Sequence, residues 1–253
     1  MPLALVRPPG PALAAGLVTH IERRPVDAEV ALRQWHGYVA AMAEAGWDIA
    51  EVAPADDCPD AVFVEDALVM FDDLCVIASP AAPSRAGEIA GAEAAVAGIG
   101  VEVHRLAAPA TLDGGDVLKV GRLVYVGVGG RTNARAVAEL AFLLAPRGWE
   151  VRPVPVHKVL HLKSAVTALP DGTVIGYPEL VDDVGAFGRF LAVPEPAGAH
   201  VVLLGDDRLL MAAGAPGSAD LFRSMGYRTV EVDIGEFEKL EGCVTCLSVR
   251  VRR

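Results

Sequence analysis

The stretch ALVMFDDLCVIA, residues 67–78, consists of an apolar run, a turn and a second apolar run. Two short apolar runs separated by turn residues predict a β-hairpin. The same pattern recurs three times further along the chain, at residues 117–128, 165–177 and 201–213, with glycine, proline or aspartate in the turns. The recurrence of this hairpin indicates a fold built from repeated units. The segments that follow each hairpin show which other elements belong to the unit.

A helical pattern follows each of these hairpins, and a short strand pattern follows each helix. The expected helices cover residues 84–97, 132–145, 183–192 and 218–224. The expected strands cover residues 101–106, 149–154, 200–204 and 227–232, the third being shared with the fourth hairpin. The N-terminal part has the same order, with a strand at 3–7, a helix at 28–45 and a strand at 47–52. The unit of hairpin, helix and strand therefore recurs about five times, at ~40–50 residues each.

The two ends of the chain are expected to complete the fifth unit. The tail CVTCLSVRV, residues 243–251, would pair with the strand LALVR, residues 3–7. Closing a ring in this way leaves no exposed strand edges. The predicted fold class is therefore α/β, a five-bladed α/β propeller with pseudo-fivefold hairpin-helix-strand repeats, formed by residues 1–253 as a single domain. An irregular mixed α/β sandwich is the alternative that the pattern alone leaves open.

Composition and charge exclude several classes of protein. The chain has 253 residues, 53% of them hydrophobic, which is enough for a sizeable core. Its net charge of −11 argues against nucleic-acid or membrane binding and suits a small cationic substrate. No apolar run is long enough to span a membrane, and prolines between Pro8 and Pro11 interrupt the apolar N-terminus, unlike a signal peptide. Four cysteines make no disulfide framework, so a reducing cytoplasm is the expected location.

Polar residues stand close to the hairpins, at equivalent places in the predicted blades. In a ring, equivalent places converge at one end of the central axis, so these side chains should meet in one pocket. The set comprises Asp60, Glu65, Asp66, Asp113, Asp116, His161, Cys243 and Cys246, with Arg85 and Arg131 near the starts of two helices. Acids, an imidazole, a thiol and two guanidinium groups are therefore expected in register.

Cys243 and Cys246 form a Cys-x-x-Cys near the end of the sequence. A buried structural cysteine, a redox pair, half of a zinc site and a nucleophile with a distant histidine and acid all fit this residue type. The segment after Cys246 alternates like a strand, and residues three apart in an extended chain are separated by roughly 10 Å. A disulfide needs less than about 7 Å between Cα atoms, so an extended chain disfavours a redox pair.

His161 and Asp113 have both a structural and a catalytic interpretation. A lone histidine on an apolar stretch such as KVLHLKSAV is more often a buried core residue. Asp113 precedes two glycines, which allow close approach of the backbone. An Asp–His–Cys arrangement would orient the imidazole and let it transfer protons. Asp116 is expected to be a structural turn or cap residue.

The other charged candidates also have a plain interpretation. Asp60, Glu65 and Asp66 could belong to a solvated loop, but acids that follow an apolar step are costly to bury without a cation. Arg85 and Arg131 could be surface residues at helix ends. As a pair they could hold a carboxylate, which arginine binds through two parallel hydrogen bonds.

Six segments resemble the dimethylarginine dimethylaminohydrolase family: FVED, PSRAGE, LDGGDVL, GRTNARA, KVLHLKSAV and GCVTCLSVR. They occur in order and span essentially the whole chain. This family belongs to a guanidine-modifying superfamily of five-bladed propellers, in agreement with the repeat. The resemblance implies hydrolysis of N-ω-methylated arginines, through a cysteine thiouronium intermediate, to citrulline and dimethylamine or methylamine. It implies no cofactor and no metal.

The resemblance also implies a role for each site residue. Cys246 would be the nucleophile, His161 the general acid and base, and Asp113 the acid that positions His161. The implied substrate contacts are Asp66 with Glu65 for the guanidinium, Asp60 for the α-amino group, Arg85 and Arg131 for the α-carboxylate, Leu17 as a lid residue and Leu240 through its backbone carbonyl. No sequence feature fixes the oligomeric state, and a homodimer is the assembly considered.

Two positions distinguish this chain from arginine and agmatine deiminases, which it resembles in the Cys, His and acid set. Deiminases usually carry His-x-Asp where this chain has Lys163 in HLKS, and Glu65 stands where deiminases and amidinotransferases tend to have arginine. One fewer carboxylate leaves a guanidinium nitrogen free to carry methyl groups. The alternatives are a deiminase-like hydrolase of another guanidine and a non-catalytic propeller that binds arginine analogues. Cys243, often glycine in the family, could be a second reactive thiol sensitive to zinc or an oxidant.

Overall fold

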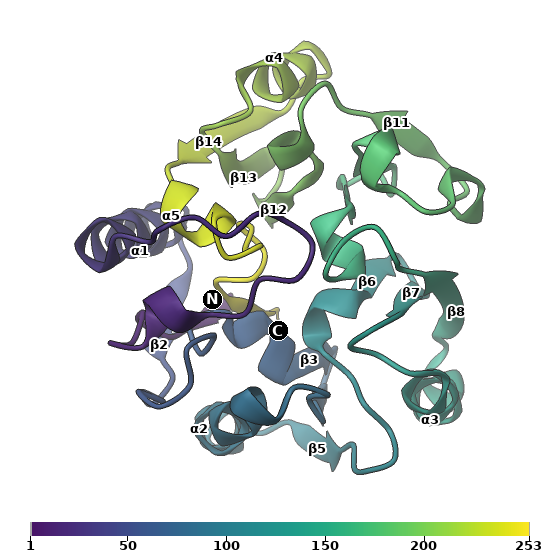
Figure 1. Cartoon of the computed structure of the whole chain (residues 1–253). Coiled ribbons are helices and arrows are strands. Elements are labelled where there is room, and N and C mark those ends of the chain that lie inside the picture. The colour runs from purple at the N-terminus through teal and green to yellow at the C-terminus, as the bar shows by residue number, and fades with distance from the viewer. Residues whose placement is uncertain (1, 253) are drawn as a thin grey trace.

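The computed structural model describes residues 2–252 and shows five small sheets arranged in a ring (Figure 1). Each sheet has three strands. In spatial order these are β15 (Val249–Val251), β1 (Leu3–Val6) and β2 (Asp48–Glu51); β3 (Leu68–Phe71), β4 (Leu74–Ile77) and β5 (Glu102–Arg105); β6 (Val117–Val120), β7 (Leu123–Val128) and β8 (Glu150–Pro155); β9 (Val166–Ala168), β10 (Val174–Gly176) and β11 (Phe190–Ala192); β12 (Val201–Gly205), β13 (Arg208–Ala212) and β14 (Arg228–Val232). The predicted fivefold repeat is confirmed, and the fold is an α/β propeller.

All five sheets share one pairing scheme. The first two strands form an antiparallel hairpin, and the third strand runs parallel to the second. In one sheet Met70 pairs with Cys75 across the hairpin, and Cys75 pairs with Val103 across the parallel edge. The ring closes where β15 runs antiparallel to β1, with Leu3 opposite Val251. The two ends of the chain therefore pair as predicted, but residues 243–248 are not part of the strand.

Helices connect the second strand to the third in four of the five sheets and lie on the outside of the ring (Figure 1). They are α1 (Ala28–Glu44), α2 (Ile89–Ala97), α3 (Ala134–Leu144) and α4 (Pro216–Ser224), and a short α5 (Gly235–Glu238) precedes the tail. Side chains cap two of them, because Asp27 and Asn133 accept backbone hydrogen bonds at the N-termini of α1 and α3. On α3, Ala136, Leu140 and Leu144 recur every four residues and are fully buried, which explains the helical pattern in the sequence.

The blade with strands β9–β11 differs from the prediction. The helix expected at residues 183–192 is absent, and a 3-10 turn (Val184–Ala186) is followed by β11. The Asp183 carboxylate caps this turn by accepting a hydrogen bond from the Gly185 N–H at 2.9 Å. The turn does not continue as a helix, because Gly185 and Gly188 disfavour helical backbone and residues 190–192 pair with β10 instead. The third strand of this blade is therefore β11, and the segment 200–204 contributes only to the next blade.

Short 3-10 turns stand just before the first strands of three blades. They cover Val64–Ala67, Gly114–Asp116 and Leu162–Ser164 and lead into β3, β6 and β9. The first turn packs against the second, and the second packs against the third. Residues at these turns therefore meet at one end of the ring, as the repeat predicted. Within residues 2–252, no helix combines the length and the apolar character needed to cross a bilayer.

Candidate active site

One small cavity at this end of the ring gathers most of the predicted site residues. Its volume is about 10 Å³, close to the space that one water molecule occupies. Among the residues that line it are Leu17, Asp60, Asp66, Arg85, Arg131, His161, Leu240 and Cys246. Asp113 lies behind His161, and Glu65 lines a different cavity. With Glu241, which also lines the cavity, the arrangement places a thiol, an imidazole, three carboxylates and two guanidinium groups around one enclosed space.

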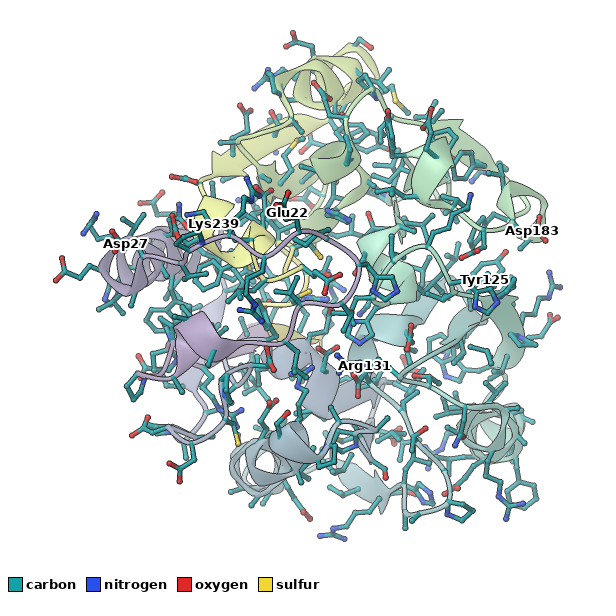
Figure 2. The ribbon with its side chains drawn as sticks, in the orientation of Figure 1. Glu22, Asp27, Tyr125, Arg131, Asp183 and Lys239 are labelled. Carbon is teal, nitrogen blue, oxygen red and sulfur yellow. The ribbon has the colours of Figure 1, made fainter. Side chains whose placement is uncertain are left out.

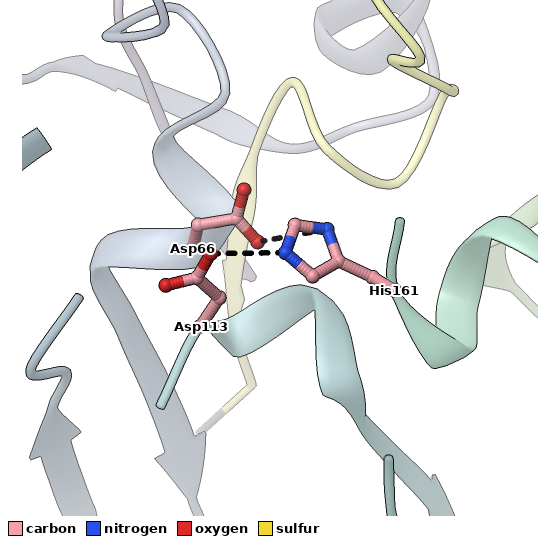
Figure 3. A group of neighbouring side chains, drawn as sticks. All are labelled: Asp66, Asp113 and His161. Carbon is pink, nitrogen blue, oxygen red and sulfur yellow. Dashed lines mark hydrogen bonds and ion pairs between the residues drawn. The ribbon is translucent and has the colours of Figure 1, made fainter. Parts of the chain in front are cut away.

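Each ring nitrogen of His161 contacts a carboxylate (Figure 3). Its Nε2 lies 3.0 Å from Asp113 Oδ2, and its Nδ1 lies 3.8 Å from Asp66 Oδ1. The Gly115 N–H donates to the same Asp66 oxygen at 2.7 Å. A Cβ at Gly115 would lie 2.7 Å from both Asp66 Oδ1 and His161 Nδ1, so only glycine fits between them. The second glycine of LDGGDVL is therefore required by the packing of the imidazole.

Electrostatics keep His161 protonated and Asp66 ionised. Burial would lower the pKa of His161, but Asp66, Asp113 and Asp116 together raise it to about 9. Burial would raise the pKa of Asp66, but His161 and Arg85 hold it well below its usual range. At neutral pH the imidazole therefore carries a proton that it can donate. Among residues 2–252, no hydrogen bond joins His161 to Cys246, so the proton donor and the thiol face one cavity without being paired.

The free energy of unfolding should depend on pH because His161 is protonated in the folded protein. The pKa of His161 in the folded protein, about 9, lies above the ordinary histidine value of 6.5, so its contribution to stability is complete below about pH 6.5 and disappears as pH rises through about 9. We expect His161→Asn to lack this contribution, which amounts to roughly 3 kcal/mol at most. The measurement is the free energy of unfolding of the wild type and of the variant, by denaturant, near pH 6 and near pH 10. Taking the difference between the two proteins at each pH removes the contributions of the titratable groups that they share. A pH-independent difference between the two proteins would contradict the raised pKa.

Arg85 and Arg131 differ in how many carboxylates their guanidinium groups already contact. Arg85 is buried and donates to Asp66 at 2.6 Å and to Glu88 at 2.9 and 2.8 Å. It is therefore fixed by two acids, and it braces Asp66. Arg131 has one contact to a carboxylate, 3.5 Å from Asp113 Oδ2, and its side chain is near the middle of the ring (Figure 2). Arg131 is thus the freer of the two guanidinium groups that line the cavity.

Glu65 does not face this cavity, although its neighbour Asp66 does. Its carboxylate pairs with Lys163 at 2.6 Å and with Arg250 at 2.5 Å. All three side chains line a separate cavity of about 80 Å³. The two positions that distinguish the sequence from deiminases, Glu65 and Lys163, are therefore partners in one ion pair. Lys163 and Arg250 both contact Oε1 of Glu65, whereas its buried Oε2 has no hydrogen-bond partner among residues 2–252. The contact of Glu65 with a substrate guanidinium therefore stays a prediction.

Asp60 links the cavity to the loop that covers it. Its Oδ1 accepts the Leu17 N–H at 3.0 Å, while its buried Oδ2 has no partner among the described residues. Burial raises the pKa of Asp60. The same loop is fastened further along, because Glu241 accepts the N–H groups of Thr19 at 2.6 Å and His20 at 2.9 Å. The loop around Leu17 therefore closes the cavity, and an arginine-sized ligand requires it to open.

We expect Glu241→Ala to weaken this closure. The variant removes three charge-assisted hydrogen bonds to the loop, from the two N–H groups and from the Thr19 hydroxyl, each of which contributes roughly 1.5–3 kcal/mol. Binding of a substrate that needs the closed loop should weaken about tenfold, and limited proteolysis within residues 17–24 should become faster. A matched control is Glu22→Ala, because Glu22 is exposed on the same loop. Equal proteolysis and equal KM in the two variants would show that Glu241 does not fasten the loop.

Cys243 and Cys246 are much closer than an extended chain allows, so the distance argument made from the sequence is wrong. The Cys246 N–H donates to the Cys243 carbonyl at 3.0 Å, which bends residues 243–246 into a turn. The two sulfurs lie 3.4 Å apart. The hydrogen bond from Cys246 lowers the pKa of Cys243 to about 5, and the same bond raises the pKa of Cys246. The two thiols therefore share a proton in the absence of a ligand.

Several supporting residues were not identified from the sequence as part of the site. Glu88 binds Arg85 but occupies an ordinary helix-start position in PSRAGE, so its partner could not be recognised. Glu241 holds the loop through its hydrogen bonds, and its backbone has a positive φ of 62°. Neither feature can be recognised in the sequence. Asp116 has the expected structural role, because it accepts hydrogen bonds from the Thr132 hydroxyl at 2.6 Å and from the Leu162 N–H at 2.9 Å. It thereby braces the turn that follows His161.

Asp66, Asp113 and His161 are also close enough together to surround one metal ion. Their charges are already compensated, however. Arg85 contacts both carboxylates, at 2.6 and 3.9 Å, and Arg131 contacts Asp113 at 3.5 Å. His161 lies between the acids as a protonated group. A metal ion would have to displace these cations, so the donor set fits a cation-lined acid cluster better than a metal site.

The chain is similar to curated proteins over almost its whole length. It is 61% identical over 249 residues to the N(G),N(G)-dimethylarginine dimethylaminohydrolase of Streptomyces coelicolor, covering 98% of this chain and 96% of that protein. A crystal structure of a cysteine-to-serine variant of the enzyme from Pseudomonas aeruginosa, in complex with citrulline, has a TM-score of 0.90, 31% identity and 98% coverage of both chains. The adduct of a histidine-to-glycine variant of a dimethylarginine dimethylaminohydrolase with S-methyl-L-thiocitrulline has the same TM-score of 0.90, identity of 31% and coverage of 98% of each chain. No family model matches the chain.

Proposed function

This chain belongs to the dimethylarginine dimethylaminohydrolase family, and we propose that it hydrolyses asymmetric dimethylarginine and monomethylarginine to citrulline and dimethylamine or methylamine. One observation carries the proposal. A single enclosed cavity brings the Cys246 thiol together with the protonated His161 and the ionised Asp66. These are the three groups that the reaction needs: a nucleophile, a proton donor and an acid that holds a cationic guanidinium.

The acids of the cavity are placed to hold the substrate. Asp66 would bind the guanidinium, and the unpartnered Oδ2 of Asp60 would accept a hydrogen bond from the α-ammonium group. Arg131, together with Arg85, would bind the α-carboxylate, with Arg131 better placed because fewer of its groups are engaged. Leu17 would act in the lid and Leu240 through its backbone, since both line the cavity. Such fixation places the guanidinium carbon beside the thiol.

Binding of the cation also prepares the nucleophile. The guanidinium carbon is a poor electrophile, because its positive charge is delocalised. A bound cation beside Cys246 favours the thiolate and so opposes the raised pKa of that thiol. The Cys246 sulfur then attacks the guanidinium carbon, and His161 gives its proton to the departing dimethylamine. The product of this step is a thiouronium intermediate on Cys246 and neutral His161.

Water completes the cycle. His161, now neutral, takes a proton from water, and the resulting hydroxide attacks the thiouronium carbon. The C–S bond breaks, the hydroxyl proton of the adduct passes to the Cys246 sulfur, and citrulline is released, so the sum is dimethylarginine plus water to citrulline plus dimethylamine. Asp113 keeps the imidazole oriented through its 3.0 Å contact with Nε2. The residues that act in these steps need no cofactor and no metal.

The ion pair of Glu65 with Lys163 supports the methylated substrate over free arginine. Lys163 stands where deiminases usually have an aspartate, and its Nζ neutralises Glu65 at 2.6 Å. Position 163 therefore supplies no carboxylate to the far guanidinium nitrogen, which can carry methyl groups. We include in the proposal a single catalytic domain over residues 1–253, a cytoplasmic location, in keeping with four free cysteines, and a homodimer.

The test is citrulline release from asymmetric dimethylarginine, monomethylarginine and arginine in parallel, with purified protein and a chelator present. We expect turnover of the methylated substrates only. Turnover of arginine instead would favour the deiminase-like alternative and would contradict the role given to the Lys163 position. No turnover of any of the three, with binding retained, would favour the non-catalytic propeller.

A further inference from the structure

The turn that carries the nucleophile holds a second thiol against it. The Sγ atoms of Cys243 and Cys246 lie 3.4 Å apart, and the Cys243 N–H points at the Cys246 sulfur at 3.4 Å. Both side chains are buried, and both cysteines are free. The Cys243 sulfur also contacts the Thr245 hydroxyl at 3.2 Å and the Lys163 carbonyl at 3.8 Å. These contacts hold the Cys243 sulfur next to the Cys246 sulfur.

The backbone already has a geometry that a disulfide permits. The hydrogen bond from the Cys246 N–H to the Cys243 carbonyl, 3.0 Å long, closes a four-residue turn. The ends of such a turn are less than about 7 Å apart between Cα atoms. Disulfides usually span about 4.4–6.8 Å between Cα atoms, so the two sulfurs can bond with a small local adjustment.

The two cysteines differ in their access to small molecules. Cys246 lines the substrate cavity, whereas Cys243 lies beside it and lines none of the described cavities. An oxidant that enters the substrate cavity therefore meets Cys246 first. The other two cysteines, Cys58 and Cys75, are buried in other parts of the fold, and burial raises the pKa of both thiols. Oxidation should therefore occur mainly at Cys243 and Cys246.

We propose that Cys243 and Cys246 form a reversible disulfide when a hydroperoxide enters the substrate cavity, with Cys246 as the oxidised thiol and Cys243 as the resolving thiol. The inference rests on the proposed function, because it takes Cys246 as the reactive nucleophile. Cys246 first gives its proton to the Cys243 sulfur, 3.4 Å away. The resulting Cys246 thiolate attacks one peroxide oxygen, the O–O bond breaks, and a sulfenic acid and hydroxide are formed. The Cys243 sulfur then attacks the sulfenic sulfur and expels its oxygen as water.

This reaction consumes two thiols and one hydrogen peroxide and yields one disulfide and two waters. The two electrons that reduce the peroxide come from the two thiols, so no other reductant takes part. While the disulfide persists, Cys246 cannot attack a guanidinium carbon. The bond also prevents further oxidation of the Cys246 sulfenic acid to the sulfinic acid, which thiols do not reverse. A reducing thiol therefore restores the nucleophile.

Both cysteines lie in one tryptic peptide, residues 240–250, which makes the disulfide directly measurable. The intact protein is treated with hydrogen peroxide, alkylated with iodoacetamide and digested. We expect this peptide to be lighter by two hydrogen atoms and unalkylated, and to become doubly alkylated after dithiothreitol. Citrulline production should fall with the same time course and return with dithiothreitol. Peroxide-treated protein in which Cys246 carries two or three oxygens and Cys243 stays alkylated would overturn the proposal.

Variants separate the resolving role from general sensitivity to oxidation. In Cys243→Ser, and equally in Cys243→Ala, we expect peroxide to drive Cys246 to the sulfinic acid, with less than about a tenth of the lost activity recovered by dithiothreitol. Cys58→Ser is the matched control and should recover as the wild type does. Equal recovery in all of these proteins would overturn the proposal. Because the disulfide is read by mass, its absence is distinguishable from a failure of the proposed hydrolase activity.

Discussion

Cys246→Ser is expected to reduce citrulline production from asymmetric dimethylarginine at least about a thousandfold. A serine hydroxyl has nearly the shape of the thiol, so the buried turn and its hydrogen bond to Cys243 should persist. The hydroxyl is nevertheless a much weaker nucleophile at neutral pH, because a bound cation cannot lower its pKa far enough to ionise it. The measurement is the rate of citrulline formation, with thermal unfolding to show that the variant is folded.

Cys58→Ser is the control for this variant, because Cys58 lies outside the substrate cavity. It should retain the wild-type rate, whereas binding of substrate to Cys246→Ser should remain detectable by calorimetry. A Cys246→Ser variant that turns over at an undiminished rate would contradict the assignment of the nucleophile. In that case the hydrogen bond between the two cysteine sulfurs would serve only to hold the turn.

His161→Gly is expected to stop turnover of methylated arginines and yet leave the first chemical step possible on a suitable substrate. Dimethylamine cannot leave without a proton, so loss of the imidazole should lower its release about a thousandfold or more. S-methyl-L-thiocitrulline carries a thiol leaving group, which can depart as an anion. We therefore expect this variant to form an adduct on Cys246 that persists, because no base activates water. Intact-mass spectrometry detects the adduct.

The control for this second prediction combines the two changes. Cys246→Ser with His161→Gly should form no adduct with S-methyl-L-thiocitrulline. Rapid citrulline release from this compound by His161→Gly would show that another group activates water. No adduct in a folded His161→Gly variant would instead show that the imidazole is needed for attack by Cys246, beyond its role toward the leaving group.

Much of the fold could be predicted because one local pattern recurs. The hairpin at residues 67–78 and its equivalents have turn residues at their centres, and the ring closes because the tail strand β15 pairs with β1. The helix expected at 183–192 is wrong, because Gly185 and Gly188 disfavour helical backbone and residues 190–192 pair with β10 as a strand. The repeat predicted the positions of the other helices and strands, and this blade is the exception.

The candidate site could be predicted as a set of residues, but their partners could not. Asp66 and His161 were placed together because they precede equivalent hairpins. The pairing of Glu65 with Lys163 and Arg250, the bracing of Arg85 by Glu88 and the fastening of the loop by Glu241 depend on side-chain directions. Likewise, the tail alternates like a strand, and only the turn at Cys243 brings the two sulfurs into contact.

The most direct test of the account is to identify the atom that carries the intermediate. The wild-type protein is mixed with asymmetric dimethylarginine, quenched with acid during turnover and digested, and the peptide of residues 240–250 is sequenced by mass spectrometry. We predict a thiouronium adduct, equal to the substrate less dimethylamine, on Cys246 alone, and its disappearance once the substrate is consumed. An adduct on Cys243, or steady citrulline release with neither sulfur modified at any time, would contradict the central claim that Cys246 attacks the guanidinium carbon.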